Sequence, residues 1–183
     1  MNAALKIKNS HLSLDGSLLQ IIDKAVVETF NSFMGITPKL KNSEMTLLTP
    51  LSDRYDISGI ISFIQDSIEG SLALRFRLNS ALKLMSRIYG EEITSVDNRV
   101  IGGVAEFANV IHGIIKDQLN QIGHHYQMCL PVVVIGDNHS VVNALSGEKL
   151  ILKYDLEGDE ATLELVLHNQ ITSIGGRNEN KPS

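Results

Sequence analysis

The chain has 183 residues, of which 43% are hydrophobic and 20% charged, a composition typical of one soluble globular domain. Its formal net charge of −5 argues against nucleic acid as the main partner, because phosphate binding requires a basic surface. No apolar stretch reaches the roughly 20 residues that a membrane span needs, and residues 1–14 lack the apolar segment of a signal peptide. We therefore expect a cytoplasmic protein that binds neither nucleic acid nor membrane.

The ends of the chain differ in pattern from the rest of it. Residues 1–14 are expected to form an N-terminal arm, residues 15–170 a single domain, and residues 171–183 a disordered tail rich in small and polar residues. The domain opens with an amphipathic helix at 17–34, which Gly35 ends in the manner of a C-terminal glycine cap. Its predicted core stripe consists of Leu19, Ile22, Val26, Phe30 and Phe33.

The middle and end of the domain alternate short strands with helices. In one strand Leu72, Leu74 and Phe76 alternate with Arg75 and Arg77, which predicts one buried face and one face in water. The pattern indicates an α+β fold in which long helices pack on a mostly antiparallel or mixed sheet. The predicted elements are a short strand at 45–48, a hairpin of 57–65 and 71–78 around a turn at 67–70, a helix at 81–89, a long helix at 95–122, a strand at 126–135 before a loop at 136–148, and a hairpin of 150–157 and 161–168.

The long helix carries the main candidate site. It is expected to begin at Thr94 or Ser95 and to end at Gly123. Glu106, Asn109 and Gly113 fall on its polar face within an arc of about 60°. A glycine inside a helix costs about 1 kcal/mol relative to alanine, so Gly113 indicates a surface that a large partner approaches closely. The opposite, apolar stripe consists of Ile101, Val104, Ala108, Ile111, Ile115, Leu119 and Ile122.

The first helix repeats this string, because Glu28, Asn31 and Gly35 have the same offsets, which suggests that the chain consists of two related halves. The two copies differ in their surroundings. Gly35 is explained more simply as a helix cap, and Lys24 stands one turn before Glu28, where it can pair with the carboxylate. The long helix has Gly102 one turn before Glu106, which leaves that carboxylate free for a partner. The pair in the long helix is therefore the better candidate.

Several of these residues also have ordinary structural explanations. Taken alone, a glutamate and an asparagine three residues apart are ordinary solvated helix residues. The sequence Gly102-Gly103 lacks the strand–loop–helix setting of a phosphate-binding loop. His112, on the flank of the helix, and the pair His124-His125 have no cysteine or carboxylate at ligand spacing, so we predict no metal site. Cys129 is expected to be a buried structural thiol.

At these residues the sequence resembles the CheC/CheX family of chemotaxis phosphatases, and its length and layout are closer to CheX. The resemblance covers roughly residues 15–168. It depends on the string Glu106-x-x-Asn109-x-x-x-Gly113, the first helix ending at 33–38, the hairpin segment 68–72 and the strand segment 131–134. Two features depart from the family pattern. Gly102 stands where the family has Asp or Ser, and Pro131 comes one residue early.

The resemblance implies removal of phosphate from the aspartyl phosphate of a CheY-like response regulator. Asn109 would orient the attacking water without becoming charged. Glu106 would anchor the regulator by pairing with a lysine in its active site, and Gly113 and Gly102 would lie in the contact. Mg²⁺ would belong to the regulator, so this chain needs no cofactor or metal of its own. Glu28 and Asn31 form a candidate second site, and CheX-like proteins pair into homodimers through their sheets. The alternative is a non-catalytic adaptor, similar to a flagellar switch protein, that only docks a regulator.

Overall fold

The computed structural model describes residues 16–47, 54–65, 68–141 and 148–169, so the predicted N-terminal arm and C-terminal tail lie outside the described residues. No helix in these ranges is long and apolar enough to cross a membrane. The elements follow in the order α1 (Gly16–Met34), β1 (Lys39–Leu47), β2 (Tyr55–Gln65), β3 (Ile68–Phe76), α2 (Leu78–Tyr89), α3 (Asn98–Gln121), β4 (Gln127–Met128), β5 (Val132–His139), β6 (Glu148–Leu156) and β7 (Asp159–Asn169).

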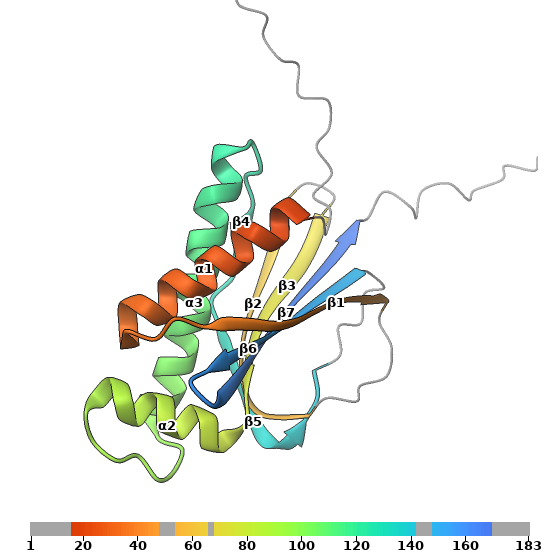
Figure 1. Cartoon of the computed structure of the whole chain (residues 1–183). Helices are drawn as coiled ribbons and strands as arrows, with labels where there is room; N and C mark the ends of the chain where they lie inside the picture. Colours follow the sequence, from red (N-terminus) through yellow and green to blue (C-terminus); the bar gives the residue numbers. More distant parts are fainter. Residues whose placement is uncertain (1–15, 48–53, 66–67, 142–147, 170–183) are drawn as a thin grey trace, which may run out of the picture.

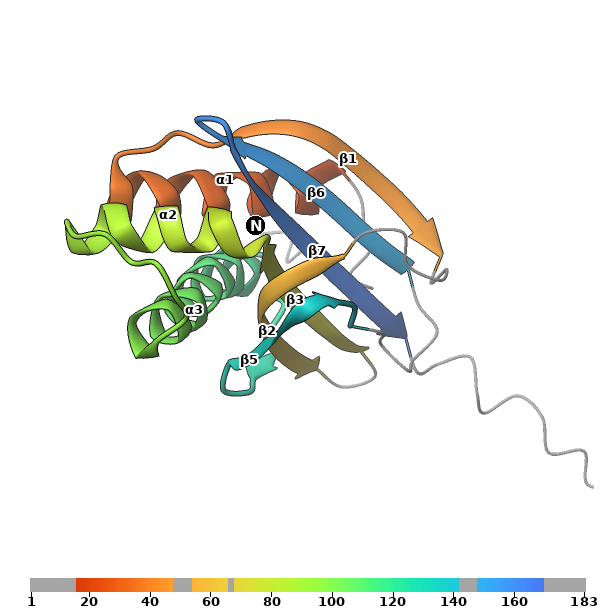
Figure 2. The same ribbon diagram turned by 90° about the horizontal axis from the view of Figure 1, so that it is seen from below.

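The molecule has two layers, with the three helices on one side of a twisted sheet (Figures 1 and 2). The seven strands follow in the order β1-β6-β7-β3-β2-β4, and β5 also pairs with β2. Every one of these pairings is antiparallel. The predicted α+β class with helices packed on an antiparallel sheet is therefore confirmed.

The strand order also reveals two related halves. If β4 is set aside, exchanging β1 with β5, β2 with β6 and β3 with β7 reproduces the order of the sheet in reverse. Each half consists of a long helix, an edge strand and a hairpin, and the halves meet where β3 pairs with β7. The repeat that the sequence suggested thus has a counterpart in the topology, and it places α1 and α3 in equivalent positions.

The core between the two layers fixes how α3 is oriented. A Cβ atom at Gly59 of β2 would lie 2.9 Å from the backbone oxygen of Val104 and 3.1 Å from the Cβ of Ala108. A Cβ at Gly103 would lie 2.1 Å from the sulfur of Met85 in α2. These contacts hold α3 against both β2 and α2, so its remaining face is turned away from the protein.

The helix boundaries were predicted within a few residues, but the predicted N-cap of the long helix was wrong. The N-cap of α3 is Asp97, not Thr94 or Ser95, and its carboxylate accepts hydrogen bonds from the backbone N–H groups of Arg99 and Val100 at 2.8 and 3.3 Å. The N-cap of α2 is Arg77, without a side-chain cap. Gly35 has φ +65°, as a C-terminal cap requires.

The predicted core stripes also need correction. In α1, Phe33 is 40% exposed and Leu19 only partly buried, while Leu18, Ala25 and Thr29 are buried. In α3, Ile101 is half-buried, and Ile122, the C-cap residue that follows the helix, is 53% exposed. The buried set is Val100, Val104, Phe107, Ala108, Ile111, His112, Ile115 and Leu119. The buried arc of α3 is wider than one stripe because α1, α2 and the sheet all contact it.

Several strand predictions were wrong in extent. The strand at 45–48 is the end of the longer β1, and the turn at 67–70 is too late, because Gln65 pairs with Ile68 and residues 68–70 belong to β3. The strand at 126–135 is interrupted at 129–131, and β5 continues to His139, inside the predicted loop. Cys129 is exposed in that interruption, not buried.

Arg75 is the clearest error in the sheet, because its side chain was expected in water and is 1% exposed. Its guanidinium donates to the carboxylate of Glu164 at 2.9 Å, and Lys149 lies 3.1 Å from the same carboxylate. Arg75 also lies 5.3 Å from the centre of the Tyr55 ring. The polar face of β3 is therefore stabilised by buried ion pairs rather than by solvent.

Candidate functional site

The exposed face of α3 presents Glu106 and Asn109, as predicted. The Glu106 side chain is exposed, and Asn109 is half-buried one turn further along. Neither side chain forms a hydrogen bond or ion pair with another residue in the described part of the chain. A carboxylate and a neutral amide are thus presented together to solvent on a rigid helix.

Two glycines flank this pair, one on each side. Gly102 is exposed and Gly113 half-buried, and a Cβ atom built on either would meet nothing within 4 Å. Nothing inside the described structure requires glycine at these positions, in contrast to Gly103. Since each glycine costs about 1 kcal/mol relative to alanine in a helix interior, an external reason is needed. A partner that lies flat along the helix provides that reason.

A cation lies toward each end of this face, and the fold pairs the one at the N-terminal end. At the N-terminal end, the Arg99 side chain donates to Asp97 at 2.9 Å and also pairs with Glu91. The hydrogen bond from Arg99 lowers the pKa of Asp97, so the cap stays ionised. Toward the C-terminal end, Lys116 continues the same face seven residues after Asn109. Lys116 was not predicted as a site residue, although its spacing of about two helical turns from Asn109 places it on this face.

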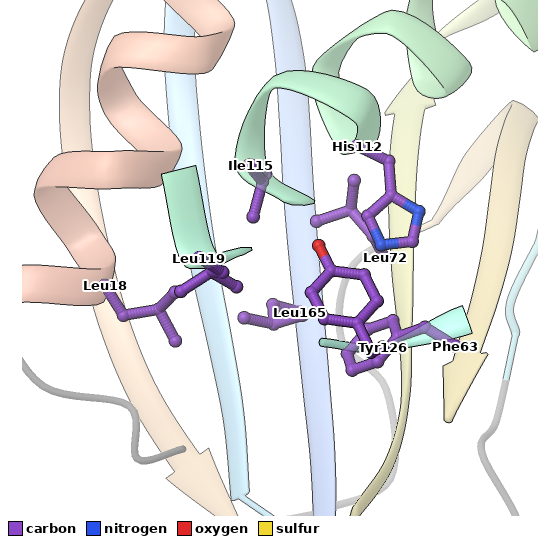
Figure 3. Close-up of a pocket in the computed structure, with 8 residues that line it drawn as sticks. All are labelled: Leu18, Phe63, Leu72, His112, Ile115, Leu119, Tyr126 and Leu165. Carbon is purple, nitrogen blue, oxygen red and sulfur yellow. The ribbon is translucent and has the colours of Figure 1, made fainter. Parts of the chain in front are cut away.

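Beside the site, α3 packs through aromatic rings against the rest of the protein. Phe107 lies between Phe30 and Phe33 of α1, with ring centres 4.9 and 5.0 Å away. His112 is 1% exposed, and its ring stacks on the Tyr126 ring with 5.4 Å between the ring centres. Both side chains line the pocket drawn in Figure 3. His112 lies on the flank of α3, about 60° around the helix from Asn109, but its ring is buried. The histidine is a core residue.

His112 lies next to a small apolar cavity. Burial, with a smaller contribution from the charge of Lys116, lowers the pKa of His112 from 6.5 to about 4, so the ring is neutral at pH 7. The cavity beside the ring has a volume of about 10 Å³ within which the centre of a water molecule can move. It can hold roughly one water molecule and is too small for a substrate. Among the described residues, no three His, Cys, Asp or Glu side chains are placed to hold a metal ion.

The predicted second site on α1 is occupied by contacts within the chain. The Glu28 carboxylate lies 3.7 Å from the ammonium of Lys24, the pair that the sequence predicted. The Asn31 amide donates to the hydroxyl of Thr37 at 3.4 Å. Glu28 and Asn31 are both exposed, but each already has a neighbour, whereas Glu106 and Asn109 have none in the described structure.

The chain is similar to known proteins in sequence and in fold. Residues 57–155 match the family described as Chemotaxis phosphatase CheX. The CheY-P phosphatase CheX of Thermotoga maritima is 27% identical over 124 residues, which cover 67% of this chain and 78% of the relative. A CheC-like superfamily protein from Shewanella sp. PV-4 has a similar fold, with a TM-score of 0.79 and 22% identity over 85% of this chain and 100% of that chain.

A further structure with a similar fold is the CheX-CheY-BeF3-Mg²⁺ complex from Borrelia burgdorferi, with a TM-score of 0.65 and 21% identity. That match covers 86% of this chain and 100% of the other. The two structural matches show the fold, and the family match, which spans more than half of the chain, shows the relationship. The protein belongs to the CheX family of chemotaxis phosphatases.

Proposed function

We propose that this protein hydrolyses the aspartyl phosphate of a CheY-like response regulator, with Asn109 and Glu106 of α3 as the reacting and anchoring side chains. The proposal depends on one observation above all. Glu106 and Asn109 are presented to solvent without a partner in the described structure, between two glycines that no internal contact requires. The relative from T. maritima bears the name CheY-P phosphatase, and the B. burgdorferi complex contains CheY, which supports a regulator as the partner.

The chemistry fits a neutral amide. Water attacks the phosphorus in line with the bond to the aspartyl oxygen, that bond breaks, and the products are the free carboxylate and inorganic phosphate. The Asn109 side chain accepts a hydrogen bond from the water and holds one lone pair toward phosphorus. An amide does not titrate near neutral pH, so it orients the water without competing for its proton.

The remaining residues position the partner. Glu106 pairs with a cation beside the phosphorylated aspartate, and the flat surfaces at Gly102 and Gly113 let the regulator approach the helix backbone. Mg²⁺, which the B. burgdorferi complex contains, is expected on the regulator, where it neutralises the phosphoryl charge. Glu28 and Asn31 remain a candidate second site, and a homodimer that forms through the sheet remains a prediction.

The test is phosphate release from a phosphorylated CheY-like regulator with the wild type, Asn109→Ala and Asn31→Ala. We expect Asn109→Ala to lower the acceleration about 100-fold or more, since a single oriented hydrogen bond commonly contributes that much. Its binding to the regulator should change little, because the alanine removes no anchoring charge. Asn31→Ala should keep most of the activity.

The same experiment distinguishes the second candidate function, an adaptor without useful catalysis. Gly102 favours the adaptor, because it supplies no carboxylate or hydroxyl one turn before Glu106, where the resemblance leads us to expect one. A wild type that binds the phosphorylated regulator without accelerating phosphate release would establish the adaptor. Acceleration that Asn109→Ala leaves intact would refute the assigned role of the amide.

A further inference from the structure

Of the two charged side chains that follow Asn109 near the Glu106–Asn109 face and that the proposed mechanism does not use, Lys116 is the cation and the exposed Asp117 the anion. At about 100° per residue, Lys116 lies within about 20° of Asn109 around α3 and about 60° from Gly113. The side chain is half-buried and has no ion pair with any residue in the described part of the chain. Arg99, the cation at the other end of the face, is already paired with Asp97 and Glu91. Lys116 is thus the unpaired cation of this face.

The geometry of the helix directs Lys116 toward the site. Helical side chains lean toward the N-terminus, so the lysine stem extends from its own turn toward Gly113 and Asn109. The stem spans roughly 6 Å, and Lys116 begins about 10 Å beyond Asn109 along the axis. Gly113 lies between them along the axis and about 60° to one side of Lys116, and it leaves open space there, since a Cβ would meet nothing within 4 Å. The ammonium can therefore reach the edge of the area that a docked partner covers.

The charge balance of the two partners explains why a cation is needed there. This chain carries a net charge of −5, and Glu106 adds a negative charge to the face itself. A phosphorylation site that binds Mg²⁺ is acidic, because proteins hold Mg²⁺ with carboxylates beside the phosphate. Two acidic surfaces repel each other unless a local cation offsets the repulsion.

We infer that Lys116 is a partner-recognition residue whose ammonium pairs with a carboxylate on the rim of the regulator's phosphorylation site. This inference rests on the proposed function, since it assigns the acidic partner of the same face. A rim ion pair acts mainly on the rate of association and on its salt dependence, and only slightly on chemistry after docking. Lys116 therefore affects the regulator concentration that gives half-maximal rate, and it leaves the maximal rate unchanged.

The experiment compares wild type, Lys116→Gln, Lys116→Glu and Lys116→Arg in steady-state phosphate release at low and high salt. The glutamine keeps a similar stem without the charge, and we expect it to raise KM about threefold to fivefold at low salt with kcat unchanged. Lys116→Glu should raise KM about tenfold or more, and Lys116→Arg should restore the wild-type value. High salt should remove most of these differences.

The matched control is Lys83→Gln, which removes an exposed lysine on α2 that pairs with Asp159 at 3.1 Å. It alters the net charge equally but lies outside the α3 face. Equal effects of Lys116→Gln and Lys83→Gln would overturn the inference, because net charge alone would then explain both. A fall in kcat with unchanged KM would also overturn it.

Asn109→Ala in the same assay separates the two proposals. Acceleration by the wild type but not by Asn109→Ala would support the proposed hydrolysis. In that case, a KM of Lys116→Gln equal to that of the wild type would refute only the role of Lys116. If the wild type fails to accelerate release, the proposed hydrolysis fails. Binding of the phosphorylated regulator to wild type and Lys116→Gln then tests Lys116 directly, and equal affinities would refute its role.

Discussion

Replacement of Gly113 by alanine should make the protein more stable and less active. Gly113 lies well inside α3, and the added methyl group would meet nothing within 4 Å. No steric penalty therefore offsets the gain in helix propensity, which is about 1 kcal/mol. For a protein of this size, that gain corresponds to a rise in Tm of about 2–4 °C.

The loss of activity follows from where the methyl group points. It projects from the face between Asn109 and Lys116, so a regulator that lies against the helix backbone would be pushed outward. A displacement near 1 Å of reacting groups costs up to about 100-fold in rate. We therefore expect Gly113→Ala to accelerate phosphate release about 10-fold to 100-fold less than the wild type does.

Urea or thermal unfolding measures the first effect and phosphate release the second. Gly102→Ala serves as a companion, because its Cβ also meets nothing, whereas Gly103→Ala is the contrast, since its Cβ would lie 2.1 Å from the sulfur of Met85. The contrast variant should gain less stability than the other two. If Gly113→Ala is more stable but releases phosphate at the wild-type rate, the partner does not approach Gly113 closely. If its stability is unchanged, the space beside Gly113 is not open.

Two further predictions concern the support of α3. Gly59→Ala should destabilise the protein by about 1–3 kcal/mol in urea unfolding, because the new methyl would lie 2.9 Å from the backbone oxygen of Val104; a neutral result would contradict the close contact of β2 with α3. The folded pKa of His112 is about 4 and the ordinary value 6.5, so the unfolded chain binds more protons between these pH values. Stability should therefore be fully present above pH 6.5 and fall by about 3 kcal/mol as the pH drops to 4. The stability of His112→Leu should change less over that range, and an equal slope in both proteins would contradict the assignment.

Local pattern was sufficient to predict the helices and the exposed face of α3. Apolar spacing marks a helix over 17–34 and another over 95–122, and the structure has α1 and α3 there. The orientation of Glu106 and Asn109 depends only on their positions relative to the buried stripe, so it was predictable too. The exact cap was not, because Thr94, Ser95 and Asp97 are all good N-cap residues and tertiary contacts decide between them.

The errors arise where distant segments determine the environment. Arg75 was assigned to water because charged residues on alternating strands usually face solvent, but its partner Glu164 is 89 positions away in the sequence. Strand β1 was underestimated because its residues are largely exposed and carry no apolar alternation to mark a strand. The burial of His112 was not predicted for a related reason, since it requires Phe63 and Tyr126 from other elements.

The two motif copies show why topology alone does not make a site. α1 and α3 occupy equivalent positions in the two halves. The ion pair of Glu28 with Lys24 on α1 does not explain the difference between the copies, because it is exposed and contributes only about 0.3–0.5 kcal/mol, too little to exclude a partner. The stronger difference is length. α1 ends one turn after Asn31, where Gly35 turns the chain with φ +65°, whereas α3 continues two further turns beyond Gly113. A partner that lies along a helix on both sides of the asparagine therefore finds that surface only on α3, which is why Asn109→Ala is expected to remove more activity than Asn31→Ala.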